Sequence, residues 1–84
     1  MLIRKCPATI RSGENTYQIL VHGQSRSDAT WEGWIEFSPV KGGTVLRTEQ
    51  ETSQPNLAAI EYWADGLEAI YFEGALARAQ GRLL

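Results

Sequence analysis

The sequence predicts a single α+β domain, in which a four-stranded antiparallel meander is covered by one helix and followed by a short strand and/or a second helix. The chain has 84 residues, 43% of them hydrophobic, which gives room for one core and one domain. In the first half, turn residues separate segments that alternate apolar and polar side chains. After position 52 the apolar residues recur at helical spacing. Within a domain of residues 1–84 we expect the sheet at about 8–51, the helix at about 54–66 and the last element at 68–82.

The first two strands are expected to form a hairpin around Gly13–Asn15, where glycine and asparagine suit a tight turn. The segment before the turn, 8–12, is short and half apolar. The segment after it places Tyr17, Ile19 and Val21 on one face, because side chains alternate along a strand. The polar stretch 24–30 is predicted to be a loop.

The clearest strand is Trp31–Ser38, which ends at Pro39 because proline has no N–H for the ladder. One face carries Trp31, Gly33, Ile35 and Phe37, and we expect the helix to cover this face. The other face is polar except for Trp34. A Gly42–Gly43 turn then leads into a fourth strand at about 44–49, with Leu46 facing inward.

The helix is predicted to start at Thr52–Ser53, whose hydroxyls suit an N-cap, with Pro55 in the first turn. It is expected to bury a stripe of apolar side chains and to end at Gly66. The members of this stripe are Leu57, Ile60, Ala64 and Leu67. For the last segment we favour a strand at 70–72 followed by a short helix, since Gly74 would destabilise one continuous helix by roughly 1 kcal/mol. One helix through the segment is the alternative.

The distribution of charge argues against nucleic acid as a partner, because the net charge is -2 and no basic stripe is present. Residues 48–77 carry six acidic side chains and no basic one. This block indicates either a solvated helix face or a surface for a basic partner. The single cysteine, the absence of an apolar leader and the absence of a membrane-length apolar run lead us to expect a cytoplasmic protein that does not enter membranes.

The candidate partner-binding residues fall into two groups. Trp34, with Glu32 and Glu36 on either side of it, is an aromatic side chain on a polar sheet face and therefore a candidate interface anchor. Burial of Trp34 under the C-terminal segment is the structural alternative. Glu61, Asp65 and Glu68 lie at helical spacing and form the second candidate surface.

The sequence offers two candidate sites for chemistry, an anion site and a cysteine–histidine pair. Arg47, Thr52 and Ser53 form a candidate anion site at the predicted helix start, where free N–H groups attract anions. Cys6 would face His22 if Ser12 pairs with Thr16, which could activate the thiol, although Pro7 argues against a regular strand there. One histidine and one cysteine cannot supply a structural zinc site. We therefore expect no metal, no cofactor and no enzymatic activity.

Several motifs between Trp31 and Ala79 resemble a family of short, uncharacterised bacterial proteins. They are W-E-G-W-I-E-F, a G-G turn, L-R-T, E-T-x-Q-P, Y-W-A-x-G-L and E-G-A-L-x-R-A. The resemblance implies a bacterial source. It implies no activity and no catalytic residues, because none is known for the family.

The function expected from the sequence is a small interaction module or an accessory subunit of a bacterial assembly, bound to another protein through an aromatic anchor and steered by acidic charge. One alternative is an antitoxin-like regulator that neutralises a basic partner, an analogy that rests on architecture alone. Another is a small ligand-binding protein. Homo-oligomerisation stays open, since an 84-residue chain buries only about 60–65% of its unfolded surface.

Overall fold

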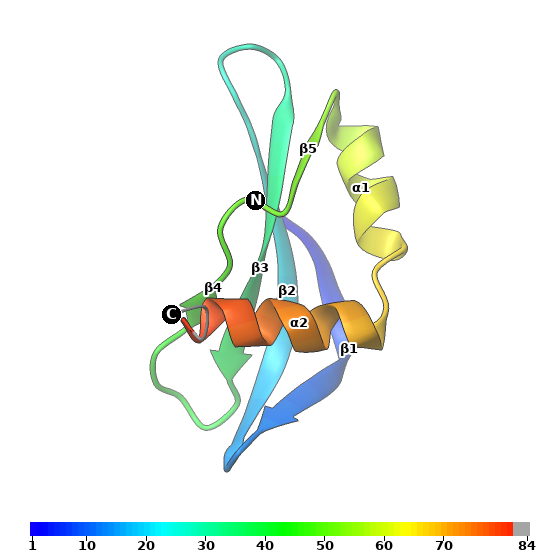
Figure 1. Ribbon diagram of the computed structural model, residues 1–84. Coiled ribbons are helices and arrows are strands. Elements are labelled where there is room, and N and C mark those ends of the chain that lie inside the picture. The colour runs from blue at the N-terminus through cyan, green and yellow to red at the C-terminus, as the bar shows by residue number, and fades with distance from the viewer. Residues whose placement is uncertain (82–84) are drawn as a thin grey trace.

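The structure is a computed structural model that describes residues 1–81. It has five strands followed by two helices, which confirms the α+β prediction (Figure 1). The elements are β1 (Leu2–Ser12), β2 (Asn15–Ser25), β3 (Trp31–Pro39), β4 (Leu46–Arg47), β5 (Thr52–Gln54), α1 (Leu57–Asp65) and α2 (Ala69–Ala79). The predicted last element extends to residue 82, which lies outside the described residues.

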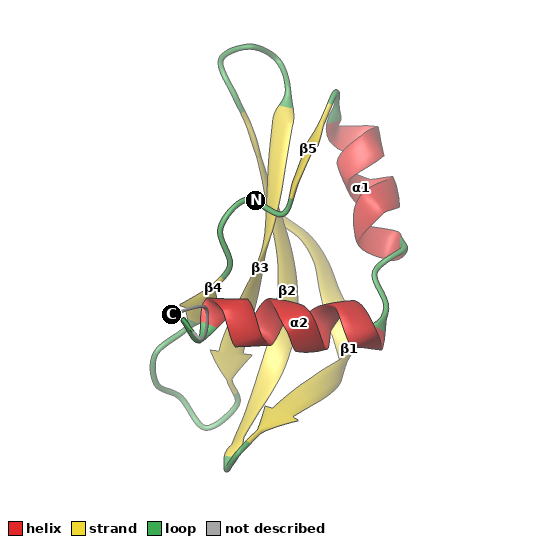
Figure 2. Cartoon of the chain, in the orientation of Figure 1, coloured by secondary structure: helices red, strands yellow, loops and turns green. Residues whose placement is uncertain are grey.

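The sheet is antiparallel with the order β1-β2-β3-β4, so the predicted meander is confirmed, and β5 pairs with β3 as well. Both helices lie on the same side of the sheet, with α2 running across the strands (Figure 2). The first hairpin is one residue tighter than predicted, because Ser12 pairs with Asn15. Gly42 and Gly43 have φ values of 85° and 120°, which confirms the predicted glycine turn.

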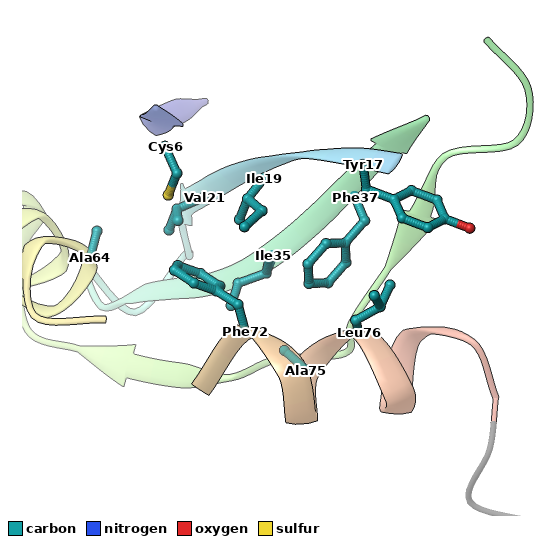
Figure 3. Close-up of a cluster of buried hydrophobic side chains, with 10 residues drawn as sticks. All are labelled: Cys6, Tyr17, Ile19, Val21, Ile35, Phe37, Ala64, Phe72, Ala75 and Leu76. Atoms are coloured by element: carbon teal, nitrogen blue, oxygen red, sulfur yellow. The ribbon is translucent and has the colours of Figure 1, made fainter. Parts of the chain in front are cut away.

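The core lies between β2, β3 and the two helices (Figure 3). Ile35 and Phe37 are fully buried, as the alternation along β3 predicts. From α2, the side chains of Phe72, Ala75 and Leu76 pack onto them at the i, i+3, i+4 spacing of a helix face. The strand that we favoured at 70–72 is therefore wrong, and the single helix is correct. The tertiary contacts of this apolar face outweigh the unfavourable Gly74.

Helix α1 sits directly above a cross-strand pair of glycines, Gly23 and Gly33. A Cβ atom on Gly33 would lie 2.8 Å from the ring of Trp63 and 3.3 Å from Ile60, so only glycine permits this approach. Leu57, Trp63 and Leu67 are partly buried, while Ile60 and Ala64 are completely buried. The predicted stripe of α1 is confirmed, and it fixes the height of the helix above the sheet.

The ends of α1 agree only partly with prediction. Gly66 is the C-cap, as predicted. The N-cap is Asn56, whose side chain accepts a hydrogen bond of 2.9 Å from the N–H of Ala59. The prediction of Thr52–Ser53 as N-cap is wrong, because these residues pair with β3 as part of β5.

The fourth strand is shorter than predicted, because Thr48 leaves the regular ladder. The N–H of Ile35 donates to the Thr48 hydroxyl at 3.0 Å, where a backbone carbonyl would otherwise accept. Thr48 itself is only 2% exposed and donates its N–H to the carbonyl of Ile35. Its side chain thus satisfies the edge of β3 and separates β4 from β5. Leu46 packs against the core, as predicted.

Candidate functional site

The side of the sheet away from the helices brings together several of the predicted site residues. Glu32, Trp34 and Glu36 alternate with the core residues of β3, so they project from this opposite side. His22 is the cross-strand partner of Trp34, and Arg47 is the partner of Glu36. We call these four side chains, His22, Trp34, Glu36 and Arg47, the tryptophan cluster.

Trp34 is only 6% exposed, so the expectation that it offers an exposed anchor is wrong. The His22 ring stacks on it with centroids 5.8 Å apart and an angle of 13° between the planes. The Arg47 guanidinium lies 4.2 Å from the ring centroid, a cation–π geometry. Within the described residues, the C-terminal helix α2 does not cover Trp34, because α2 packs on the other side of the sheet. The ring is buried instead by its cross-strand neighbours.

Glu36 holds the tryptophan cluster together. One carboxylate oxygen accepts a hydrogen bond of 3.1 Å from the indole N–H of Trp34. The other lies 3.3 Å from Nε2 of His22, which is ion-pair distance, although the geometry is not that of a hydrogen bond and Nε2 is buried without one. Both oxygens of Glu36 thus have partners inside the chain, which leaves this carboxylate little capacity for an external partner.

Glu32 is also engaged within the chain. Its carboxylate lies 3.5 Å from the Arg26 guanidinium. Arg26 in turn donates to the hydroxyl of Ser53 at 3.0 Å and makes a short hydrogen bond to Gln50. This network joins the loop after β2 to β5. The carboxylates of Glu32 and Glu36 on the polar side of the sheet therefore contact side chains of the same chain, and this side is not an open acidic surface.

The predicted anion site is not assembled. Thr52 pairs with Gly33 and lies on the helix side of the sheet, whereas Ser53 pairs with Glu32 and lies on the other side. The Arg47 guanidinium lies over the Trp34 ring and not beside Thr52 or Ser53. Because α1 begins at Leu57 and not near Thr52, its free N–H groups are elsewhere. The prediction is wrong for a topological reason, since the predicted helix start is a strand.

The proposed pairing of Cys6 with His22 is likewise wrong. Cys6 is 5% exposed and points into the core, while His22 belongs to the opposite side of the sheet and pairs with Leu2. Burial raises the pKa of the Cys6 thiol, which the nearby Arg4 guanidinium opposes only in part. A buried thiol of this kind is a poor nucleophile at neutral pH.

The solvent side of the two helices carries the second group of predicted residues. Glu61, Asp65 and Glu68 are exposed. Two exposed apolar side chains in the same stretch of the sequence were not predicted as functional: Tyr62 is 84% exposed and Ile70 is 79% exposed. Glu73 is exposed in the next turn of α2. We call this set the acidic helix surface, defined by Glu61, Tyr62, Asp65, Glu68, Ile70 and Glu73. Tyr62 could have been found from the sequence, since it falls outside the buried stripe of α1.

A further cluster, which sequence reasoning missed, fastens α2 to the segment before β5. The Glu51 carboxylate accepts a short hydrogen bond from the Tyr71 hydroxyl and one of 2.6 Å from Arg78. Burial first, and then the Glu51 carboxylate, raise the pKa of Tyr71 to about 12. The phenol therefore stays protonated and donates to Glu51. No sequence signal links these residues, which are 20 and 27 positions apart.

Within residues 1–81, no group of three or more histidine, cysteine or acidic side chains is arranged to hold a metal ion. In the same part of the chain, no helix is long and apolar enough to cross a membrane. Comparison with protein-family models, with curated proteins and with solved structures finds no match in any of the three.

Proposed function

We propose that this chain is a non-enzymatic interaction module that presents the acidic helix surface to a basic protein, as an accessory subunit of a bacterial assembly. The observation that carries the proposal is the exposure of Tyr62 and Ile70, at 84% and 79%, among four carboxylates on the same pair of helices. Single exposed apolar residues are common on protein surfaces. Here the two most exposed of the large hydrophobic side chains lie in a short segment that also contains four carboxylates and no basic residue.

The carboxylates of the acidic helix surface have no cation to balance them. Among the residues that the structure describes, none of Glu61, Asp65, Glu68 and Glu73 has a basic side chain within 4.0 Å. By contrast, the Glu32 carboxylate lies 3.5 Å from the Arg26 guanidinium, and the Glu51 carboxylate lies 2.6 Å from that of Arg78. An uncompensated field of one sign speeds association with an oppositely charged partner and disfavours partners of like charge.

Tyrosine is a frequent contributor to binding energy at protein interfaces, because it buries a large rigid ring and keeps a polar end. Tyr62 projects from α1, which is held firmly on the sheet by Ile60 and Ala64. The ring is thus presented on a rigid element and loses little conformational freedom on binding. The tryptophan cluster lacks this property, since Trp34 is already buried within the chain.

The proposal also places the module in the bacterial cytoplasm. Its support is the resemblance of the motifs between Trp31 and Ala79 to short bacterial proteins, together with a single buried cysteine. An antitoxin-like role is the special case in which the basic partner is a toxin. The identity of the captured partner decides between this case and an accessory subunit.

The test is a pull-down from lysate of the source organism with three forms of the tagged protein. These are the wild type, the double variant Tyr62→Ser/Ile70→Ser, and a control double variant, Val40→Ser/Val45→Ser, which changes two exposed valines outside the helices. We expect a basic protein that the wild type and the control retain, that the Tyr62/Ile70 variant loses, and that salt elutes. Equal capture by all three forms would contradict the proposal. The proposal would also be contradicted if the wild-type protein isolated from this lysate had the solution mass of a monomer with no partner bound.

A further inference from the structure

A groove lies between the edge strand β1 and the start of α2. Its volume is 380 Å³, at the low end of the range of about 300–1,000 Å³ that is typical of small-molecule sites. The floor and walls are mostly apolar and include Cys6, Ile10, Ile19, Leu67 and Phe72. We call this hollow the β1–α2 groove.

An irregularity in β1 accounts for one wall of the β1–α2 groove. Lys5 pairs with Leu20, but the next paired residue is Thr9, which pairs with Gln18. Cys6, Pro7 and Ala8 therefore lie opposite the single residue Ile19, which is a bulge of three residues against one. Pro7 cannot donate a ladder hydrogen bond, which fits its place in the bulge. The bulged segment lines the groove opposite the first turn of α2.

One end of the β1–α2 groove is electropositive. The Arg4 guanidinium donates to the Ala64 carbonyl at 2.9 Å, which fixes it beside the junction of the two helices. Within residues 1–81, no carboxylate lies within 4.0 Å of it. Ala69, the first residue of α2, also lines the groove, and the N-cap Glu68 makes no side-chain hydrogen bond to the first turn. The partial positive charge of this helix end therefore adds to that of Arg4.

The remaining charges of the lining are Arg11 and Glu73. Arg11 donates Nε to the Gly13 carbonyl at 3.3 Å and lies seven positions along β1 from Arg4. Glu73 lies one turn into α2, so it opposes an anion in the groove, but the two guanidinium groups leave the lining with a net positive charge. An apolar groove with a cationic end is complementary to an amphipathic anion and not to an amphipathic cation.

We propose that the β1–α2 groove binds a small amphipathic carboxylate, with the carboxylate between Arg4 and the first turn of α2 and the apolar body against Ile10, Leu67 and Ala69. The carboxylate receives charge-assisted hydrogen bonds from Arg4, and the apolar body covers the parts of these three side chains that otherwise contact water. Of the residues that define the acidic helix surface, the lining of the groove includes Glu73. The carboxylate site stands independently of the proposed function.

The test is a titration of the ¹⁵N-labelled protein with sodium octanoate, followed by amide chemical shifts. Octylammonium chloride, which has the same chain and the opposite charge, is the matched control probe. We expect saturable shifts from octanoate at residues 4–10 and 67–73, and none at the tryptophan cluster. Saturable binding of octylammonium at the same amides with equal affinity would overturn the proposal. The same holds if octanoate leaves these amides unshifted.

Variants test the assigned position of the carboxylate. Arg4→Met removes the guanidinium, while Lys5→Met removes the neighbouring cation, which pairs with Leu20 on the other side of the sheet. We expect Arg4→Met to bind octanoate about tenfold more weakly, as the loss of one charge-assisted hydrogen bond implies, and Lys5→Met to bind it like the wild type. Equal weakening by both variants would overturn the proposal. The comparison of the two probes needs only the wild type, so it decides the question even if Arg4→Met does not fold.

Discussion

Replacing Gly33 by alanine tests how closely α1 approaches the sheet. The added Cβ atom would lie 2.8 Å from Cζ3 of Trp63, 3.0 Å from Cγ2 of Thr52 and 3.3 Å from Cδ1 of Ile60. Overpacking of this kind costs about 1–3 kcal/mol. Alanine also lowers the conformational entropy of the unfolded chain, which offsets about 0.4–1 kcal/mol of this cost. We therefore expect Gly33→Ala to lower the free energy of unfolding by about 1–2 kcal/mol.

Gly74→Ala is the matched control, because it makes the same chemical change at an exposed position within α2. There the added Cβ atom meets only Nη1 of Arg78, at 3.5 Å, which is ordinary contact. Alanine is preferred to glycine inside a helix by about 0.5–1 kcal/mol, so this variant should be more stable than the wild type. The two substitutions are thus expected to change stability in opposite directions.

The assay is urea unfolding followed by tryptophan fluorescence and circular dichroism, with the melting temperature as a second measure. In a domain of this size the expected loss for Gly33→Ala corresponds to a decrease of roughly 5–15 °C. The dependence on urea should keep the same slope, because the extent of unfolding is unchanged. If Gly33→Ala is as stable as the wild type while Gly74→Ala is stabilised, α1 does not pack over the Gly23–Gly33 pair. The rigid presentation of Tyr62 would then lose its basis.

Three further predictions concern single side chains. Tyr71 should ionise near pH 12 in a difference titration at 295 nm between the wild type and Tyr71→Phe, and a transition near pH 10 would contradict its burial against Glu51. Since this folded pKa exceeds the unfolded value of about 10, its stabilising contribution is complete below about pH 10 and is lost as the pH rises toward 12. Asn56→Ala should lower the free energy of unfolding by about 1 kcal/mol, more than Ser53→Ala, because only Asn56 caps α1. Trp34→Ala should lower the free energy of unfolding by about 3–5 kcal/mol in a urea melt, whereas the same change at an exposed tryptophan would leave that free energy almost unchanged.

The parts of the fold that follow from local periodicity could be predicted from the sequence. The alternation along β3 identifies Ile35 and Phe37 as core, and the helical spacing of Ile60 and Ala64 identifies the buried side of α1. Both patterns depend only on neighbouring residues. The exposure of the predicted acidic residues of α1 follows from the same reasoning.

Features that depend on register or on side-chain replacement of a backbone group could not be predicted. The tighter hairpin turn shifts the register by one residue, and the bulge at Cys6–Ala8 then shifts it further, so Cys6 does not face His22. The Thr48 hydroxyl replaces a ladder acceptor and shortens β4. Trp34 is buried because the cross-strand register brings His22 and Arg47 over its ring. The exposure of Ile70 could not be predicted either, because an apolar side chain at this position suits a buried strand. In the structure Phe72 and Leu76 pack into the core, and Ile70 therefore lies on the solvent side of α2.

The pairing of carboxylates decides which of the two predicted surfaces is the better candidate. The sequence offers acidic residues on both the sheet and the helices, and composition alone does not distinguish them. In the structure, Glu32 and Glu51 each lie within 4.0 Å of an arginine side chain, and Glu36 accepts a hydrogen bond from Trp34, so binding a cationic partner there would first break an internal contact. Glu61 and Asp65 have no such contact among residues 1–81, and Tyr62 is exposed on the same helix. A basic partner therefore displaces only water at the helices, which is why the proposed interface lies there and not at Trp34.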